Sequence, residues 1–200
     1  MNILEGRPGE TFRERSIPVL ETERLVLRAP RLGDAKTIAA LANDRQIAEN
    51  TARVPHPYKL ADAKEWIRST RSRAGEATFL ITLANGDMIG ACGIDLRGEV
   101  TPELGYWLGR PYWGQGFATE AVRALIDHAF TDLDHSTLLA GARVTNPASR
   151  RVLEKCGFQW TGVGLCRIRA LNSSTPIDCF RLERGIWASL KRWGTTRRVA

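Results

Sequence analysis

The sequence has little of what marks a membrane, secreted or metal-binding protein. No apolar run approaches the length needed to cross a bilayer, and the first ten residues contain no hydrophobic stretch resembling a signal peptide. The four cysteines are widely spaced without a CxxC pair, and the three histidines lack ligand spacing with one another or with a cysteine. We therefore predict a cytoplasmic protein with reduced thiols, no bound metal and no membrane association.

Basic charge is in excess but is not concentrated. The chain carries 29 Lys and Arg against 22 Asp and Glu, a formal net charge of +7, and its one basic cluster is near the C-terminus, at Lys191, Arg192, Arg197 and Arg198. No stripe of basic residues is interleaved with aromatics, and no nucleic-acid-binding module is recognisable. The pattern favours a solvated surface and no nucleic-acid partner; the other use of such charge is to attract a polyanionic small molecule.

Hydrophobic periodicity predicts one α/β domain at residues 21–185, with residues 1–20 as an N-terminal extension and residues 186–200 as a basic C-terminal tail. A chain of 200 residues with 43% hydrophobic content suits a single core. Strands are predicted at 25–29, 77–83, 88–96, 103–109 and 137–144, helices at 33–42, 60–73, 116–130 and 147–156, and a β-rich stretch at 158–183. No internal repeat or linker suggests a second domain.

Three strands carry more specific expectations. Alternation over 77–83 predicts a strand with one more polar face, made by Thr78, Leu80 and Thr82. The apolar run 137–144 is typical of a strand that is covered on both faces. Gly90 and Gly93 within 88–96 indicate a bulge or a close approach of another backbone.

A glycine-rich turn joins the strand at 103–109 to the helix that follows it. Gly114 and Gly116 let successive backbone N–H groups point into one concavity, because neither residue has a Cβ in the way. The free N–H groups and the positive end of the helix dipole add to this site. The turn is therefore a candidate pyrophosphate site, although a GxG pair alone equally describes a tight turn without a ligand.

The turn resembles the acyl-CoA pyrophosphate loop of the GCN5-related N-acetyltransferases (GNAT), whose pattern is Q/R-x-x-G-x-G/A. Gly114 and Gly116 match it, whereas Pro111 stands at the Gln/Arg position, which removes one side-chain contact and leaves the backbone cradle. Further segments resemble the RimJ/RimL-type branch of this family: ETERLVLR (21–28), PY (57–58) with DAKEWI (62–67), LGYWL (104–108), WGQGFATEA (113–121) and NPASRRVLEKCGF (146–158). The match runs in order from about residue 21 to 180.

This resemblance implies a mixed, mostly antiparallel central sheet, flanked by helices and splayed between the strands at 103–109 and 137–145. Acetyl-CoA would insert its pantetheine arm into the splay, and an amine would attack the thioester directly, with the N–H of Leu108 stabilising the oxyanion. The implied cofactor-binding residues are Trp107, Leu108, Gly109, Trp113, Gly114, Gln115, Gly116, Phe117, Ala118, Thr119, Asn146, Ser149, Arg150 and Lys155.

Two residues are the candidates for proton chemistry. Glu103 is at the position where the family often has a carboxylate that takes the amine proton, directly or through water; alternatively it is a strand-end charge facing solvent. Many relatives have a tyrosine where this chain has Leu153, and in the RimJ/RimL branch the thiolate partner is a serine, here Ser149. Asn146 would bond the pantetheine or simply cap its helix.

The sequence thus favours an acetyl-CoA-dependent N-acetyltransferase acting on a small-molecule amine or a peptide N-terminus. A non-catalytic acyl-CoA-binding protein of the same fold is the alternative, and a homodimer is compatible with the resemblance because relatives often dimerise. The acceptor pocket is expected between the first two helices, the loop around Tyr58 and the stretch 167–176. The aromatics Tyr58, Trp66, Tyr106 and Trp107 either shape this pocket or belong to the core.

Overall fold

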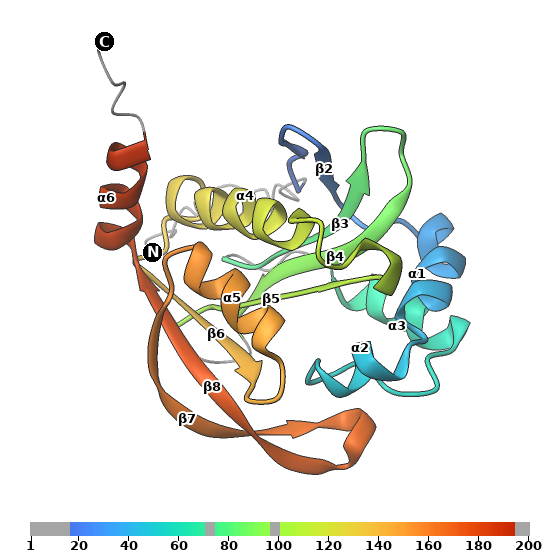
Figure 1. Cartoon of the computed structure of the whole chain (residues 1–200). Helices are drawn as coiled ribbons and strands as arrows, with labels where there is room; N and C mark the ends of the chain where they lie inside the picture. The colour runs from blue at the N-terminus through green and yellow to red at the C-terminus, as the bar shows by residue number, and fades with distance from the viewer. Residues whose placement is uncertain (1–16, 71–74, 97–100, 195–200) are drawn as a thin grey trace, which may run out of the picture.

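The computed structural model describes residues 17–70, 75–96 and 101–194 (Figure 1). Residues 1–16 of the predicted N-terminal extension, residues 71–73 of the helix predicted at 60–73, and Arg197 and Arg198 of the predicted tail lie outside the described residues.

In the described residues an eight-stranded sheet forms the centre of the fold, with the strand order β1-β2-β3-β4-β5-β6-β8-β7. The strands are β1 (Leu20–Glu21), β2 (Leu25–Arg28), β3 (Ala77–Leu83), β4 (Met88–Asp95), β5 (Glu103–Leu108), β6 (Thr137–Arg143), β7 (Gln159–Ile168) and β8 (Ser173–Glu183). Neighbouring strands pair antiparallel except β5 and β6, which are parallel. The mixed, mostly antiparallel sheet is confirmed.

Helices pack on both faces of the sheet. The helices α4 (Phe117–Thr131) and α5 (Pro147–Lys155) lie over one face, as Figure 1 shows, and bury the larger core cluster, which includes Phe79, Leu104 and Phe180. The helices α1 (Ala35–Ala42) and α3 (Leu60–Ser69) cover β3 and β4 from the other face, and α2 (Arg45–Glu49) follows α1.

The second helix layer corrects the expectation of a polar face on β3. Leu80 is fully buried and Thr82 is 3% exposed. Leu80 packs in the cluster formed with α1 and α3, and the hydroxyl of Thr82 donates to the Val26 carbonyl at 2.8 Å. The two threonines led to the prediction of a solvent-exposed face. A threonine can nevertheless be buried when its hydroxyl hydrogen-bonds to the neighbouring strand.

Strand β6 differs from its prediction in the opposite sense. Leu138, Ala140 and Ala142 are buried in the larger cluster, whereas Leu139 is 37% exposed and Gly141 is also exposed. Only the face under α4 and α5 is buried, so the apolar run does not represent a strand covered on both sides. An exposed single leucine is ordinary, because folded proteins keep much apolar area at the surface.

The sheet opens between β5 and β6. These strands pair only at Glu103 with Leu139 and Leu104 with Ala140. Beyond that point β5 continues to pair with β4 as far as Leu108, and β6 continues with β8 as far as Arg143. The two halves of the sheet therefore diverge after Leu104, which confirms the splay. We call the space between Gly105–Leu108 and Gly141–Arg143 the gap.

The glycines of β4 fulfil the expectation of irregular pairing. The register shifts so that Ile81 pairs with Gly90 but Thr82 pairs with Met88, which leaves Ile89 as an extra residue. A Cβ on Gly90 would collide with the carbonyl oxygen of Trp107, so the backbones approach too closely for any other residue.

The predicted C-terminal tail is largely a helix, α6 (Arg184–Gly194). The indole of Trp187 packs against Phe130 with ring centroids 5.3 Å apart and donates to Asp127 at 2.6 Å. Lys191 bonds the same carboxylate at 2.7 Å. Ile186, Trp187 and Leu190 recur at helical spacing, a signal that the basic composition of the segment obscured. The short helix α2 also went unpredicted, although Asp44 caps it by accepting from Gln46 and Ile47.

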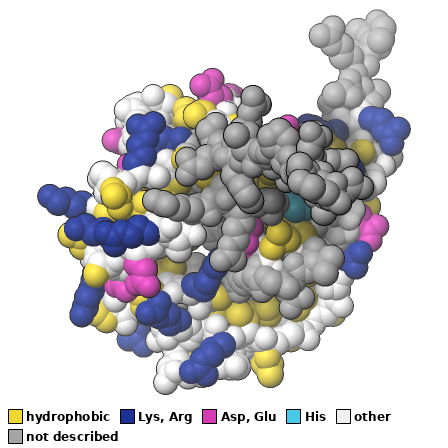
Figure 2. All heavy atoms as spheres, turned by 180° about the vertical axis from the view of Figure 1, so that it is seen from behind, with side chains coloured by type: hydrophobic (Ala, Val, Ile, Leu, Met, Phe, Trp, Pro, Cys, Tyr) yellow, Lys and Arg dark blue, Asp and Glu magenta, His cyan; other side chains and the backbone are white. Residues whose placement is uncertain are grey.

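None of the helices in the described parts of the chain combines the length and apolar character that a bilayer crossing requires. On the face seen in Figure 2, Lys and Arg side chains are dispersed among polar and apolar ones rather than gathered into a stripe.

Candidate active site

The turn between β5 and α4 adopts the conformation that its glycines allow. Gly114 has φ 75° and Gly116 has φ 84°, both in the left-handed region that other residues avoid. Gly116 is the N-cap of α4, and the first intrahelical bond of the turn runs from the Glu120 N–H to its carbonyl at 3.1 Å. The N–H groups of Phe117, Ala118 and Thr119 consequently have no intrahelical acceptor.

This turn fits a diphosphate group. A Cβ built on Gly114 would meet no atom within 4 Å, so open space lies beside the backbone there. Unpaired N–H groups at a helix N-terminus, together with the helix dipole, are a ready site for such an anion. The residues present therefore suit the pyrophosphate of a CoA ester.

Two side chains of the turn are engaged within it. The indole N–H of Trp113 donates to the Leu108 carbonyl at 2.7 Å and ties the turn to the end of β5. The amide of Gln115 donates to the Pro111 carbonyl at 2.9 Å. Both residues, predicted to contact a cofactor, hold the loop's shape through their side chains.

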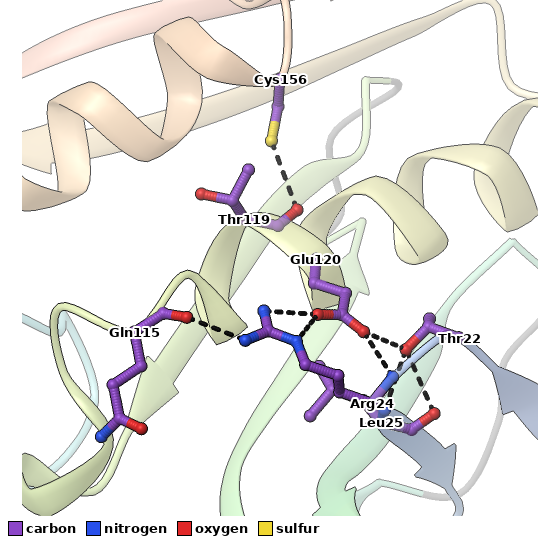
Figure 3. Close-up of polar contacts among 7 residues, drawn as sticks. All are labelled: Thr22, Arg24, Leu25, Gln115, Thr119, Glu120 and Cys156. Atoms are coloured by element: carbon purple, nitrogen blue, oxygen red, sulfur yellow. Dashed lines mark hydrogen bonds and ion pairs between the residues drawn. The ribbon is translucent and has the colours of Figure 1, made fainter.

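The sequence analysis missed an arginine that lies directly beside the turn. Arg24, directly before β2, forms an ion pair with Glu120 in the first turns of α4 at 2.6 Å, and its Nη1 donates to the Gln115 carbonyl at 3.1 Å (Figure 3). Its guanidinium carbon also lies 4.5 Å from the centre of the Phe117 ring. The one signal available was that Arg24 falls within the segment ETERLVLR.

Glu120 has further donors that keep it ionised. Its carboxylate accepts from the Thr22 hydroxyl at 2.6 Å and from the Arg24 backbone N–H at 2.9 Å. Burial by itself raises the pKa of Glu120, but the hydrogen bonds from Thr22 and Arg24 and the charge of Arg24 together bring that pKa below its usual value.

The gap is lined by backbone groups of β5. The Gly109 N–H donates to the Ile89 carbonyl on β4 at 2.8 Å, and the Trp107 carbonyl lies against Gly90 on the same side. Because backbone polar groups alternate in direction along a strand, the N–H of Leu108 points the other way, into the gap. Of Trp107, Leu108 and Gly109, it is Leu108 that offers an N–H there.

Helix α5 places Ser149 at the gap. Asn146 caps the helix by accepting from the Ser149 N–H at 3.1 Å, which confirms its capping role. The Ser149 hydroxyl is 2.8 Å from the hydroxyl of Tyr106, which also donates to the Ser149 carbonyl at 3.2 Å. Burial raises the pKa of Tyr106 well above its usual range, so its hydroxyl keeps its proton. Leu153, the position at which the family resemblance implies a tyrosine, is fully buried.

Glu103 is not brought together with these groups. Leu104, Tyr106 and Leu108 belong to the cluster under α4 and α5, so Glu103 and Trp107 project from the opposite face of β5. Glu103 also stands where β5 and β6 are still paired. At ~3.3 Å per residue, its backbone is about 17 Å from Leu108.

The two basic residues predicted on α5 lie in different surroundings. Arg150 pairs with Glu154 at 2.9 Å and with Asp178 at 3.4 Å, on the side facing β8. Lys155 instead lines a groove of about 850 Å³ that also includes Gly116, Thr119, Arg123 and Arg24. Lys155 is therefore close to the glycine turn, whereas the guanidinium of Arg150 is occupied elsewhere.

Neither buried thiol is suited to act as a nucleophile. Burial raises the pKa of Cys156 to about 11 and that of Cys92 further still. Within the described ranges 17–70, 75–96 and 101–194, no three His, Cys, Asp or Glu side chains are grouped so as to hold a metal ion.

Comparisons with known proteins identify the family of the chain. The acetyltransferase (GNAT) domain family matches residues 24–159. The N-acetyltransferase p20 of Bacillus licheniformis is 33% identical over 150 residues, which cover 72% of this chain and 84% of that protein.

Two solved structures share the fold. RimL, a ribosomal L7/L12 alpha-N-protein acetyltransferase solved with coenzyme A, superposes with a TM-score of 0.73 at 18% identity, covering 83% of this chain and 98% of that one. The spermidine N-acetyltransferase of Vibrio cholerae, solved with CoA and spermine, gives a TM-score of 0.70 at 21% identity over 84% and 99% of the two chains.

Proposed function

The chain belongs to the GNAT acetyltransferase family and is an acyltransferase, and from this premise we propose that it transfers the acetyl group of acetyl-CoA directly to a primary amine. The observation that carries the proposal is the gap beside β5, with the glycine turn after its end and the Leu108 N–H directed into it. An extended pantetheine arm could hydrogen-bond there as an added strand does.

Four groups of residues would hold the cofactor. The N–H groups of the turn and of the first residues of α4 would bind its pyrophosphate. Lys155 and Arg123 line the adjoining groove and supply positive charge for the remaining phosphate. Leu108 would bond the arm, and α5 would hold its thiol end beside Ser149. When bound, the cofactor supplies an activated acyl group as a thioester.

Three groups would act on the thioester as it reacts: the Leu108 N–H, the Ser149 hydroxyl and, through Ser149, the Tyr106 hydroxyl. The Leu108 N–H would donate to the oxygen of the reacting carbonyl as negative charge develops there. Ser149 would donate a hydrogen bond to the thiolate. For this, Tyr106 would turn its single proton from the Ser149 carbonyl to the Ser149 hydroxyl, which leaves the serine proton free. Tyr106 therefore acts as a positioning residue in this scheme. It supplies a tyrosine hydroxyl from β5, because Leu153 stands where the family resemblance implies a tyrosine.

The amine must lose a proton, and we assign this to Glu103 through water. An α-amine of pKa ~8 is neutral about one time in ten at pH 7, whereas a lysine-like amine of pKa ~10.4 is neutral less than about one time in 10³. Glu103 projects on the same side as Trp107, opposite Ser149, so an amine arriving from that side would meet the base while the thiolate is held on the other. Because its backbone is about 17 Å from that of Leu108, the proton would have to pass along a chain of several waters to reach Glu103.

The acceptor amine would enter from the side of the sheet on which α1, α2 and α3 lie. The turn after β7 is held there, because the Arg169 N–H donates to the Ala52 carbonyl at 3.0 Å. The end of β6 is held there as well, because Arg143 donates to the Glu49 carbonyl at 3.0 Å. Among the similar structures one protein acts on a protein N-terminus and another on a polyamine. We therefore propose a small-molecule amine or a peptide N-terminus as the acceptor class.

The decisive experiment combines binding and turnover. Calorimetry should detect acetyl-CoA binding, and a thiol assay should detect CoASH release with members of a panel of amino acids, polyamines and short peptides. Binding without release from any acceptor would support the alternative of a non-catalytic acyl-CoA-binding protein. Absence of binding would refute both.

A further inference from the structure

Pro111 removes from the glycine turn the side chain that the family pattern supplies, and Arg24 contacts the same turn while also lining the groove that Lys155 and Arg123 line. Arg24 is distant in sequence and reaches the turn from the position directly before β2, beside the first residues of α4 (Figure 3). A Cβ on Gly116 would come 3.4 Å from its Nη2, so the guanidinium is in close contact with the turn.

The hydrogen bond from Arg24 to Gln115 determines the direction of a neighbouring N–H. The peptide group between Gln115 and Gly116 is planar and trans, so its carbonyl and its N–H point in opposite directions. Because Arg24 holds the Gln115 carbonyl toward β2, the Gly116 N–H points away from β2. A flip of this peptide would reverse that N–H and offer a carbonyl oxygen to an approaching phosphate.

The ion pair with Glu120 keeps Arg24 in this position and cancels an unfavourable charge. Glu120 is close to the helix N-terminus, where its carboxylate would repel a pyrophosphate if it were unpaired. Its side chain is only 17% exposed, while that of Arg24 is 44% exposed. Two contacts fix the guanidinium on the carboxylate, from Nε at 2.7 Å and from Nη2 at 2.6 Å, and leave Nη1 for Gln115.

We propose that Arg24 is a positioning residue that holds the glycine turn in its pyrophosphate-binding form and thereby sets the affinity for acetyl-CoA. This inference rests on the proposed function. Arg24 acts through the turn's backbone, which it holds from a segment distant in sequence.

The test compares three thioesters with Arg24→Gln and the wild type. Acetyl-CoA and 3′-dephospho-acetyl-CoA both carry the pyrophosphate, whereas S-acetylpantetheine lacks it. We expect Arg24→Gln to lower kcat/KM about tenfold for the first two, equivalent to about 1.4 kcal/mol, and to leave it unchanged for S-acetylpantetheine. Arg24→Lys, which keeps the charge but not the fork of donors, should recover part of the loss.

Controls separate positioning from folding. Arg181→Gln removes another surface arginine, paired with Glu183 at 3.2 Å and far from the turn, and should leave all three values as in the wild type. An equal loss for all three thioesters would indicate a merely structural role, and a loss confined to acetyl-CoA would indicate contact with the 3′-phosphate; either would overturn the inference. If Arg24→Gln fails to fold, Arg24→Lys gives the same comparison. If the wild type binds and turns over acetyl-CoA and both Arg24 variants have the same kcat/KM as the wild type, this inference is wrong and the proposed function still stands.

Discussion

Replacing Tyr106 by phenylalanine removes one hydroxyl and keeps the ring that packs in the core. That hydroxyl is 2.8 Å from the Ser149 hydroxyl and donates to the Ser149 carbonyl at 3.2 Å. In the variant nothing in β5 orients the Ser149 side chain. We expect turnover to fall because the serine proton loses its fixed direction toward the leaving thiolate.

The size of the effect follows from the bond that is lost. A buried hydrogen bond between neutral groups contributes about 1 kcal/mol, so kcat should fall about fivefold. The same loss should lower the free energy of unfolding by about 1 kcal/mol, a shift of roughly 2–4 °C in Tm for a domain of this size. KM for acetyl-CoA should change little, because the turn is untouched.

A double-mutant cycle with Ser149→Ala isolates the relevant contact. If Tyr106 acts through Ser149, the double variant should be no slower than Ser149→Ala alone, with a coupling free energy of about 1 kcal/mol. Turnover is measured by thiol release at saturating acetyl-CoA, and stability by thermal unfolding. Tyr112→Phe is the matched control, because that ring packs against the same core and its hydroxyl has no part in the scheme. Additive effects on kcat, or an unchanged kcat in Tyr106→Phe, would refute the reasoning.

Three further outcomes are expected. Gly116→Glu should abolish acetyl-CoA binding in calorimetry, because φ is 84° there and the new carboxylate would repel the pyrophosphate; Gly33→Glu, where a side chain meets open space, is its control, and retained affinity in Gly116→Glu would disprove the cradle. Glu103→Gln should lower turnover at neutral pH with partial recovery at high pH, and an unaltered pH–rate profile would exclude it as the base. The lowered pKa of Glu120 makes its stabilising contribution complete above the unfolded pKa of ~4.3 and progressively lost as pH falls through the lower folded value. Urea denaturation of wild type and Glu120→Gln should therefore differ more at pH 6 than at pH 3, and a constant difference would contradict this assignment.

The sequence was sufficient for the parts of the fold that repeat a local rule. Gly86 has φ 92° in the turn between β3 and β4, where Asn85-Gly86 predicts a hairpin. Asn146 and Pro147 predict the start of α5 because they satisfy its free N–H groups and preset its first φ. The splay between β5 and β6 came from the resemblance, since no local pattern encodes where two strands cease to pair.

What the sequence could not provide depends on contacts between distant segments. The burial of Thr82 required knowledge that α1 and α3 cover β3, and that the Val26 carbonyl would accept a hydrogen bond from its hydroxyl. The partners of Arg24 and Tyr106 come from other elements, so no spacing along the chain pairs them. Arg150 and Lys155 looked equivalent on one helix, and only the neighbouring Asp178 distinguishes them.

The early end of the pairing between β5 and β6 has a consequence for self-association. From Gly105 onward one side of β5 pairs with no other strand, although the Leu108 carbonyl on that side accepts from the Trp113 indole; strand edges of this kind ordinarily invite pairing with other proteins and aggregation. Here that edge lies in the interior of the sheet, with β6 and β8 on its far side and α4 and α5 over one face. A strand with side chains on both faces would have to displace those elements, whereas a thin unbranched chain would not. The fold thus leaves the edge of β5 accessible to a thin unbranched ligand and excludes a polypeptide strand from it.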